Sequence, residues 1–405
     1  MKETRPDINI LRRIPRSIWV LGFVSMLMDI SSEMIHGLLP LYLVTVLGVS
    51  MATVGLIEGM AEATASIVKI FSGALSDRFG KRKILAAIGY GLAAFTKPVF
   101  PLAASLGWIV AARFVDRVGK GIRGAPRDAL IADIAPEDSR GASFGLRQTL
   151  DTIGAFVGPL IAIALMWLSA NNFTLVFWIA VIPGLLSFLL IMFAVREPER
   201  APGTGVTQSP LSVAAIKKLG GAYWWIVAVA SVFTLARFSE AFLLLRAQQV
   251  GLPLVLVPAV LVVMNVVYAL SAYPAGALSD KVDRIKVLIF GLGLLIVADL
   301  ALAAPFGGLW MVGLGVALWG LHMGFSQSLF AALVADAAPA DLRGTAYGWF
   351  NLFGGVAMLA ASVIAGELWD HFGSAVTFLT GAGITFFALA GVIVLRGRMS
   401  PDAKA

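Results

Sequence analysis

GALSDRFGKRK, from Gly73 to Lys83, recurs as GALSDKVDRIK from Gly276 to Lys286. A second stretch, ALIADIAPEDSRGASFG from Ala129, recurs as ALVADAAPADLRGTAYG from Ala332. Both copies follow their originals by 203 residues. Apolar segments often resemble one another by chance, but polar loops that match twice at one spacing indicate duplication of a large unit. The sequence therefore predicts a chain built from two similar halves.

The composition predicts a polytopic helical membrane protein. The 405 residues are 59% hydrophobic and 14% charged, and their mean hydropathy is +0.88. An average soluble domain has about 25% charged residues, so a water-soluble enzyme is excluded. Because one helical span needs about 20 apolar residues, the chain has room for twelve. Its apolar runs are long and continuous, unlike the alternating strands of a membrane β-barrel.

The apolar runs set the expected topology. They predict spans near residues 17–47, 51–76, 84–104, 106–135, 142–168, 173–195, 222–245, 253–279, 287–304, 308–335, 344–368 and 375–395. We expect a tail over 1–16, six-helix halves over 17–195 and 221–396, a linker over 196–220 and a tail over 397–405. Outside the spans, Lys and Arg all lie on the side of the N-terminus, except Arg246. This bias predicts cytoplasmic termini in a cell (inner or plasma) membrane protein.

Several partners and chemistries are disfavoured. The net charge of +7 comes without a basic tract interleaved with aromatic residues, so no nucleic-acid partner is expected. The absence of cysteine excludes disulfides and thiolate metal sites. No glycine-rich loop ending in GK[ST] is present, which disfavours ATP-driven transport by this chain alone. No small-residue cleavage site follows the basic N-terminal stretch, so we expect that stretch to be retained.

The repeated loops resemble the signature loop of the major facilitator superfamily, and the resemblance extends over the whole chain. The first copy contains Gly73, Asp77, Arg78 and Gly80, and the second keeps Gly276 and Asp280. The resemblance implies a twelve-helix, all-α secondary transporter in which two halves rock around a central site. It also implies that Asp77 and Asp280 act as latches when the cytoplasmic gate is closed. We assign the other residues of these loops to gating as well: Gly73, Arg78, Gly80 and Gly276. Topology anchoring is the alternative role for the basic residues of this loop.

The predicted fifth span carries a second resemblance. Gly145, Gly154, Gly158, Pro159 and Ala162 are arranged as in the motif of the drug/proton antiporter branch, whose last position is Gly rather than Ala. Small residues at a spacing of four let helices approach closely, and a proline permits bending. We therefore assign Gly154, Gly158 and Pro159 to conformational change. Helix packing alone is the alternative.

The predicted fourth span has one strongly charged face. Its members are Arg113, Asp116, Arg117, Lys120, Arg123 and Arg127. At about 100° per residue these side chains occupy an arc of roughly 120°. A charge that faces lipid at mid-membrane costs roughly 2.5–3.5 kcal/mol, so this face is expected to line water or meet partners.

Four acids on the first two spans are the predicted proton-coupling group: Asp29 and Glu33 on one, Glu58 and Glu62 on the other. A proton-coupled carrier needs a carboxylate whose proton affinity changes with conformation, and movement toward or away from a cation provides this. These spans carry fewer bases than acids. The proton is thus the expected coupling ion, with no other cofactor.

The basic face of the fourth span is expected to hold an anionic or zwitterionic organic solute, because guanidinium groups match carboxylates and phosphates. The resemblance places spans 1, 4, 7 and 10 around the site. Predicted solute-binding residues are His36, Arg113, Asp116, Arg117, Lys120, Arg123, Arg147, Asp151, Arg237, Glu240, Trp319 and His322. Basic and acidic residues inside the spans are equally numerous, so mutual pairing without a ligand stays open.

The sequence therefore favours an exporter that works by proton antiport. The alternatives are uptake of an organic anion by proton symport, and export of a metal or its chelate with Asp29, Glu33 and His36 as ligands. A membrane enzyme and a receptor that binds without translocation are further rivals. The expected partners are a small solute and the lipid bilayer, and a monomer is favoured although the oligomeric state is open.

Overall fold

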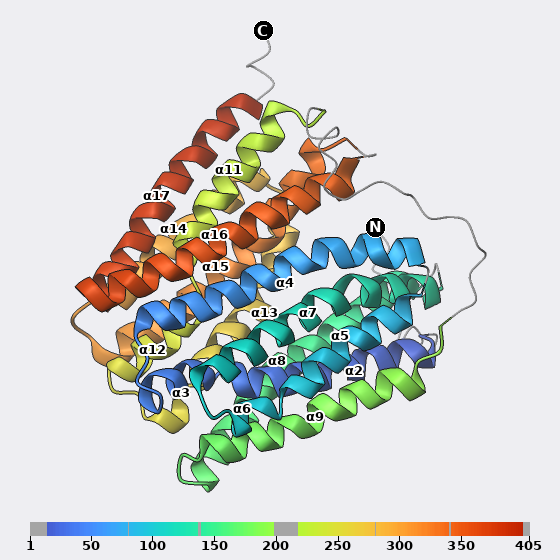
Figure 1. Cartoon of the computed structure of the whole chain (residues 1–405). Helices are drawn as coiled ribbons and strands as arrows, with labels where there is room; N and C mark the ends of the chain where they lie inside the picture. Colours follow the sequence, from blue (N-terminus) through green and yellow to red (C-terminus); the bar gives the residue numbers. More distant parts are fainter. Residues whose placement is uncertain are drawn as a thin grey trace. The chain divides into compact units, whose positions relative to one another are not determined.

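The computed structural model describes residues 14–79, 81–136, 139–197, 218–279, 281–339 and 342–399. All regular secondary structure in these ranges is helical, as predicted (Figure 1). Gly80 and Asp280, both predicted to act in gating, lie outside the described residues, as do most of the predicted linker and the ends of both tails. Asp77 and Arg78 belong to a helix, but their side chains lie outside the described part.

The first six spans follow the predicted order. They are α2 (Arg16–His36) with α3 (Leu39–Thr45), α4 (Met51–Phe79), α5 (Arg82–Thr96) with α6 (Val99–Leu102), α7 (Leu106–Ile134), α8 (Arg140–Leu168) and α9 (Phe173–Ala194). Polar or glycine-containing turns separate them. These turns are not helical because a helix is stabilised mainly by the packing of its apolar side chains, which the turns lack.

The last six spans also follow that order. They are α11 (Gly221–Ala236) with α12 (Ala241–Gln249), α13 (Ala259–Ser279) after the short 3₁₀ turn η2 (Leu254–Leu256), α14 (Arg284–Ala303), α15 (Gly308–Ala337), α16 (Arg343–Phe372) and α17 (Ser374–Met399). Ten spans in the described ranges are long and apolar enough to cross a membrane by composition alone. The other two are α4 and α7, which hold most of the predicted intramembrane charges.

Three spans that we expected to be continuous are each divided into two α-helices in the described part of the chain. The first breaks before Pro40 and the third at Pro98, because proline has no N–H group and its ring clashes with the preceding helical turn. The seventh breaks between Ala236 and Ala241 without a proline. Side chains satisfy the backbone there, since the N–H of Ser239 donates to Ser362 Oγ at 3.2 Å.

Packing divides the described chain into two compact units. Unit 1 contains the described residues up to 35, 68–161 and those from 172 to 197. Unit 2 contains 36–67, 162–171 and the described residues from 218 onward. The division into repeat halves at the linker is a different partition, and it stays a prediction.

Unit 1 is held together around α2. Leu21, Val24 and Met28 of this helix pack with Tyr90 of α5 and Ile191 of α9 in one buried apolar cluster. Two hydroxyls also tie α2 to α9, since Ser31 Oγ donates to the carbonyl of Ala180 and Ser187 Oγ donates to that of Val24, both at 2.6 Å. The core thus fixes α2 against the helices that carry the charged residues.

Unit 2 has an aromatic core. The ring of Phe238, in the break of the seventh span, contacts the rings of Phe242, Trp319 and Phe378 at centroid distances of 5.4–5.7 Å. Arg246 of α12 caps carbonyl groups at the end of α14, with Nε 2.8 Å from the oxygen of Leu302 and Nη2 3.0 Å from that of Ala304. This capping accounts for the one basic residue outside the spans that the predicted topology puts opposite the N-terminus.

Candidate functional site

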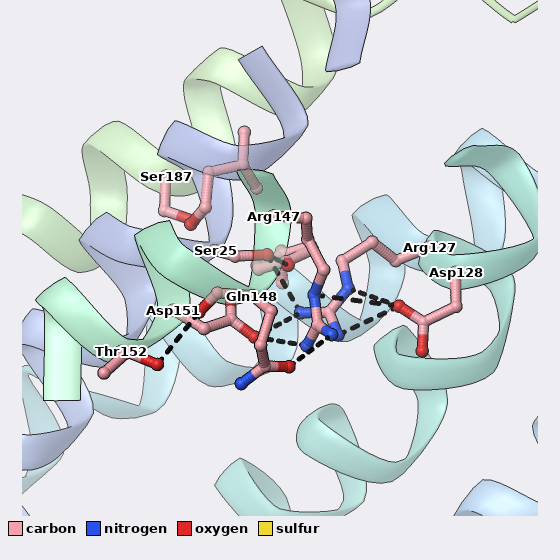
Figure 2. Close-up of polar contacts among 10 residues, drawn as sticks. Ser25, Arg127, Asp128, Arg147, Gln148, Asp151, Thr152 and Ser187 are labelled. Atoms are coloured by element: carbon pink, nitrogen blue, oxygen red, sulfur yellow. Dashed lines mark hydrogen bonds and ion pairs between the residues drawn. The ribbon is translucent and has the colours of Figure 1, made fainter. Parts of the chain in front are cut away.

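Two arginines and two aspartates form a cluster between α7 and α8 (Figure 2). Arg147 Nη2 of α8 pairs with Asp151 Oδ2 one turn later. Arg127 of α7 donates through Nε to its neighbour Asp128 Oδ1 at 3.1 Å and lies 3.9 Å from Asp151 Oδ2. Arg147 Nε is also 3.9 Å from Asp128 Oδ1. Each carboxylate therefore meets both guanidinium groups, and we call this group the arginine–aspartate cluster.

The cluster extends to α2 and α5 through hydroxyl groups. Arg127 Nη1 donates to Ser25 Oγ at 2.9 Å, and that oxygen lies 3.0 Å from the hydroxyl of Tyr90. Arg123, one turn earlier on α7, places its guanidinium 5.1 Å from the centre of the Tyr90 ring, within cation–π range. Three other helices of unit 1, α2, α5 and α8, thus contact the α7 charges.

Asp29 of α2 faces the same charges. It interacts electrostatically with Asp151 of α8 and with Lys120, Arg123 and Arg127 of α7. The helices can meet here because α8 has no side chain at Gly154, where a Cβ would lie 2.6 Å from the Met26 carbonyl oxygen and 3.0 Å from Asp29 Cβ. Gly158 makes the same kind of contact with Ile30 and Glu33. The small residues predicted for conformational change therefore hold α8 against the predicted proton-coupling residues.

Exposure differs along the α7 face. Arg113, Asp116, Arg117 and Arg123 are buried, whereas Lys120 is exposed. The predicted stripe is thus one largely buried row with one accessible ammonium group.

Asp116 has a partner that we did not predict. Lys97, in the break between α5 and α6, places its Nζ 2.9 Å from Asp116 Oδ1 and 3.1 Å from Ser32 Oγ. A lysine within an apolar run, directly before Pro98, was the available signal, because a buried ammonium group needs a carboxylate partner. Asp116 is therefore already committed to an ion pair.

Unit 2 gathers the other predicted acids and bases. His36 Nε2 lies 3.7 Å from Glu58 Oε2, and Glu58 of α4 is fully buried. Arg237, in the seventh-span break, interacts electrostatically with Glu240, with Tyr268 of α13 and with Glu62, one turn after Glu58. Of the predicted residues on α4, Glu58 thus contacts the end of the first span, whereas Glu62 interacts with the seventh.

Gln327 of α15 completes this group, and we did not predict it. With its amide oxygen facing Arg237, it accepts from Nη2 at 2.8 Å and from Nη1 at 3.1 Å. The sequence signal was weak, because Gln327 lies five residues beyond His322, the last solute-binding residue predicted on the tenth span.

Trp319 and His322 of the same helix are in a different setting. Both are completely buried, and the His322 ring packs edge-on against Phe233 and Trp319. These two predicted solute-binding residues therefore belong to the aromatic core of unit 2. Asp299 of α14 was not predicted either, and it is fully buried with no hydrogen-bond partner in the described part of the chain.

The repeated loops produce matching ion pairs. Arg82 Nη1, at the start of α5, lies 2.7 Å from Asp133 Oδ2 near the end of α7. In the second copy, Arg284 Nη1 of α14 lies 2.6 Å from Asp336 Oδ2 of α15. The aspartates are equivalent positions of the two repeats, whereas the arginines differ by one position. The same contact is thus made from two slightly different loops.

The glycines of these loops are less alike. A Cβ at Gly73 would lie 3.4 Å from Ala125 Cβ, whereas one at Gly276 would meet nothing within 4 Å. For the metal alternative, no three His, Asp or Glu side chains among the described residues gather closely enough to hold an ion.

Comparison with known proteins places this geometry in context. The family model of the Major Facilitator Superfamily matches residues 21–360 and 246–405. An uncharacterized MFS-type transporter of Methanocaldococcus jannaschii is 32% identical over 392 residues, which cover 95% of each chain. The quinolone resistance protein NorA of Staphylococcus aureus is 24% identical over 190 residues, covering 47% of this chain and 48% of NorA.

Solved structures share the fold. The nucleoside transporter NupG superposes with a TM-score of 0.79 at 14% identity, over 94% of this chain and 100% of NupG. A D-xylose-proton symporter superposes with a TM-score of 0.70 at 18% identity, over 93% of this chain and 96% of the symporter. At such low identities, the similarity concerns the fold alone.

Proposed function

This chain belongs to the major facilitator superfamily of multi-pass membrane transporters, and from that premise we propose that it exports a small anionic or zwitterionic organic solute in exchange for protons. The proposal has three parts: the charge of the solute, the coupling to protons and the direction. Different residues support each part.

The charge of the solute is inferred from the α7 face. From Arg113 to Arg127 this face carries five cationic side chains and a single carboxylate, Asp116. That carboxylate is shared between Lys97 of another helix, at 2.9 Å, and Arg117 of α7, at 3.9 Å, so cations still outnumber carboxylates on this face. A positive surface within the membrane is unfavourable unless anions approach it. This surplus of positive charge is the single observation that carries the proposal, with the exposed Lys120 as the first contact for a solute.

Coupling to protons is inferred from carboxylates that face cations. Asp29 faces Lys120 and Arg123, and Glu62 faces Arg237. An ionised carboxylate beside these cations can hold the cationic group of a zwitterionic solute while the cations hold its anionic group. A proton on the carboxylate removes that attraction and displaces the solute. Competition between proton and solute for the same carboxylate would link the two fluxes in opposite directions.

Export is supported by α8 and by one relative. Gly145, Gly154, Gly158 and Pro159 resemble the motif of drug/proton antiporters, and NorA is by name a resistance protein. Both halves would then rock around the charged site by alternating access, with termini in the cytoplasm. Proton-driven uptake of an organic anion is the second candidate, since a D-xylose-proton symporter has the same fold.

The proposal is tested in two steps, a ligand screen on the purified protein and then transport in proteoliposomes. A thermal-shift screen of organic anions, zwitterions and cations on the purified protein would first identify a solute, because a bound ligand raises Tm. We expect an anion or zwitterion to stabilise the protein, and Lys120→Gln to weaken this effect. Arg284→Gln, which changes an exposed arginine on α14, is the matched control.

The identified solute is then followed under imposed proton gradients. We expect uphill movement opposite to the proton flux in the parent protein, and loss of that dependence in Asp29→Asn or Glu62→Gln. Solute and proton moving in the same direction would favour symport instead. Exchange of labelled solute that is indifferent to the gradient in every variant would refute proton coupling, and no exchange at all would point to a receptor.

A further inference from the structure

A carboxylate from a distant helix caps the start of α4. Asp370, near the end of α16, accepts the backbone N–H of Met51 at 2.9 Å through Oδ1 and that of Ala52 at 2.8 Å through Oδ2. These are the first two N–H groups of α4, which have no partner within their own helix. The local cap, Ser50, serves a different group, because its Oγ accepts the N–H of Thr53 at 3.2 Å. Asp370 therefore holds donors that α4 itself cannot satisfy.

The two helices pack closely behind this contact, and Figure 1 shows the first part of α4 beside α16. A Cβ at Gly59 would lie 3.0 Å from the carbonyl oxygen of Leu359, and one at Gly366 would lie 2.6 Å from Ala52 Cα. Gly55 likewise lies directly against the backbone of Ser362. Small residues spaced four apart let two membrane helices come together in this way. The carboxylate contact thus lies at the end of a close-packed seam.

The position of the seam connects it with the opening and closing of the transporter. Both segments lie within unit 2, but α4 is the second span of the first predicted half and α16 is the fifth span of the other. In the predicted topology, α4 begins and α16 ends at the face opposite the chain termini. Alternating access requires the halves to separate at this face whenever the solute site opens there. The Asp370 contact must therefore break in that state.

We propose that Asp370 is a latch that holds α4 and α16 together and so stabilises the state that is closed at the face opposite the termini. It would be the counterpart, on the other face, of the gating role expected for Asp77. The attraction is between a full negative charge and the positive end of a helix, with two hydrogen bonds that fix its direction. The proposal rests on the alternating-access part of the proposed function, but not on the solute or on proton coupling.

Thiol labelling of the full-length protein tests the latch without any transport assay. The chain contains no cysteine, so Ser362→Cys introduces a single reporter thiol at a fully buried position whose Cβ faces Gly59 in the seam. The labelling rate by a soluble maleimide then measures how often the seam opens. Asp370→Asn is compared with Glu367→Gln, which removes an exposed carboxylate one turn earlier on the same helix, paired with His371 at 3.3 Å.

We expect Asp370→Asn to raise the labelling rate of the reporter thiol about two- to five-fold, because charge–helix interactions at exposed sites are worth about 0.3–1 kcal/mol. Glu367→Gln should leave the rate unchanged. Gly366→Val, which forces the helices apart, sets the rate for a seam that cannot close. Fast labelling in Gly366→Val together with parental labelling in Asp370→Asn would overturn the latch, as would equal rates in all variants. Circular dichroism and Tm of each variant confirm that it is folded.

Discussion

The Nζ atom of Lys97 lies 2.9 Å from Oδ1 of Asp116, and the two side chains are only 2% and 4% exposed. In this buried environment each charge stabilises the other, because either one alone would be strongly unfavourable. The pair joins the end of α5 to the middle of α7. It therefore fixes the register of the helix that carries the cationic face.

Removal of one partner of this pair should be far more harmful than removal of both. We expect Lys97→Met to destabilise the protein by about 3–5 kcal/mol, because the buried Asp116 carboxylate loses its close partner and keeps only the 3.9 Å contact with Arg117 Nε. The double variant Lys97→Met with Asp116→Leu should recover most of the loss. Thermal unfolding of the purified protein measures both. A single variant as stable as the parent would show that the two charges do not depend on each other.

The glycines of α8 should differ sharply in their tolerance of a methyl group. Gly154→Ala places a Cβ 2.6 Å from the Met26 carbonyl oxygen, so we expect a loss of about 1–3 kcal/mol from overpacking. Gly145→Ala, in the same helix, meets nothing within 4 Å and should be neutral or stabilising by up to about 1 kcal/mol. The difference in Tm between the two variants is the measurement. Equal effects would mean that α2 and α8 do not meet at Gly154.

The two repeat-related ion pairs should contribute unequally to stability. Arg82 and Asp133 are 11% and 19% exposed, whereas Arg284 and Asp336 are 39% and 53% exposed. Water and salt screen exposed pairs, so Asp336→Asn should cost less than about 1 kcal/mol. We expect Asp133→Asn to lower the stability clearly more than Asp336→Asn does. The destabilisation by Asp133→Asn should persist in high salt, whereas that by Asp336→Asn should not. The opposite ranking in thermal unfolding would contradict the exposure argument.

Within the arginine–aspartate cluster, the two carboxylates should also rank by burial. Asp151 is 12% exposed and Asp128 is 37% exposed. Replacement of Asp151 by Asn removes the negative charge that faces Arg127 and Arg147 and replaces one acceptor oxygen by a donor, so we expect about 1–3 kcal/mol of destabilisation. Asp128→Asn should cost under about 1 kcal/mol. Denaturation of the two variants side by side decides the ranking, with Asp128→Asn as the control.

The helices were largely predictable from local sequence, and their interruptions were not. Long apolar runs define α8 and α9 to within two residues at each end, because membrane insertion depends mainly on length and hydropathy. The break at Arg237 has no such signal, since it is stabilised by the hydroxyl of Ser362, more than a hundred residues away. Predictions based on periodicity do not contain contacts of that range.

Many of the residues in the candidate site could be predicted from the sequence, but most of the pairs that they form could not. Arg147 and Asp151 meet because four residues make one helical turn, which the sequence shows directly. The partners Lys97 and Gln327 lie on other helices, and only the packing angle brings them to Asp116 and Arg237. The contact of Asp370 could not be predicted for a different reason. It binds backbone N–H groups, which almost every residue has, so no sequence pattern marks its partner.

The interrupted seventh span has one more consequence. Because α11 ends at Ala236 and α12 begins at Ala241, the two segments have separate ladders of backbone hydrogen bonds. A rotation of one segment is therefore not transmitted rigidly to the other, and the break acts as a hinge. Arg237 and Glu240 lie in this hinge, so bending there alters the distance between two opposite charges. Mechanical deformation of this span is thereby converted into a change of electric field inside the protein.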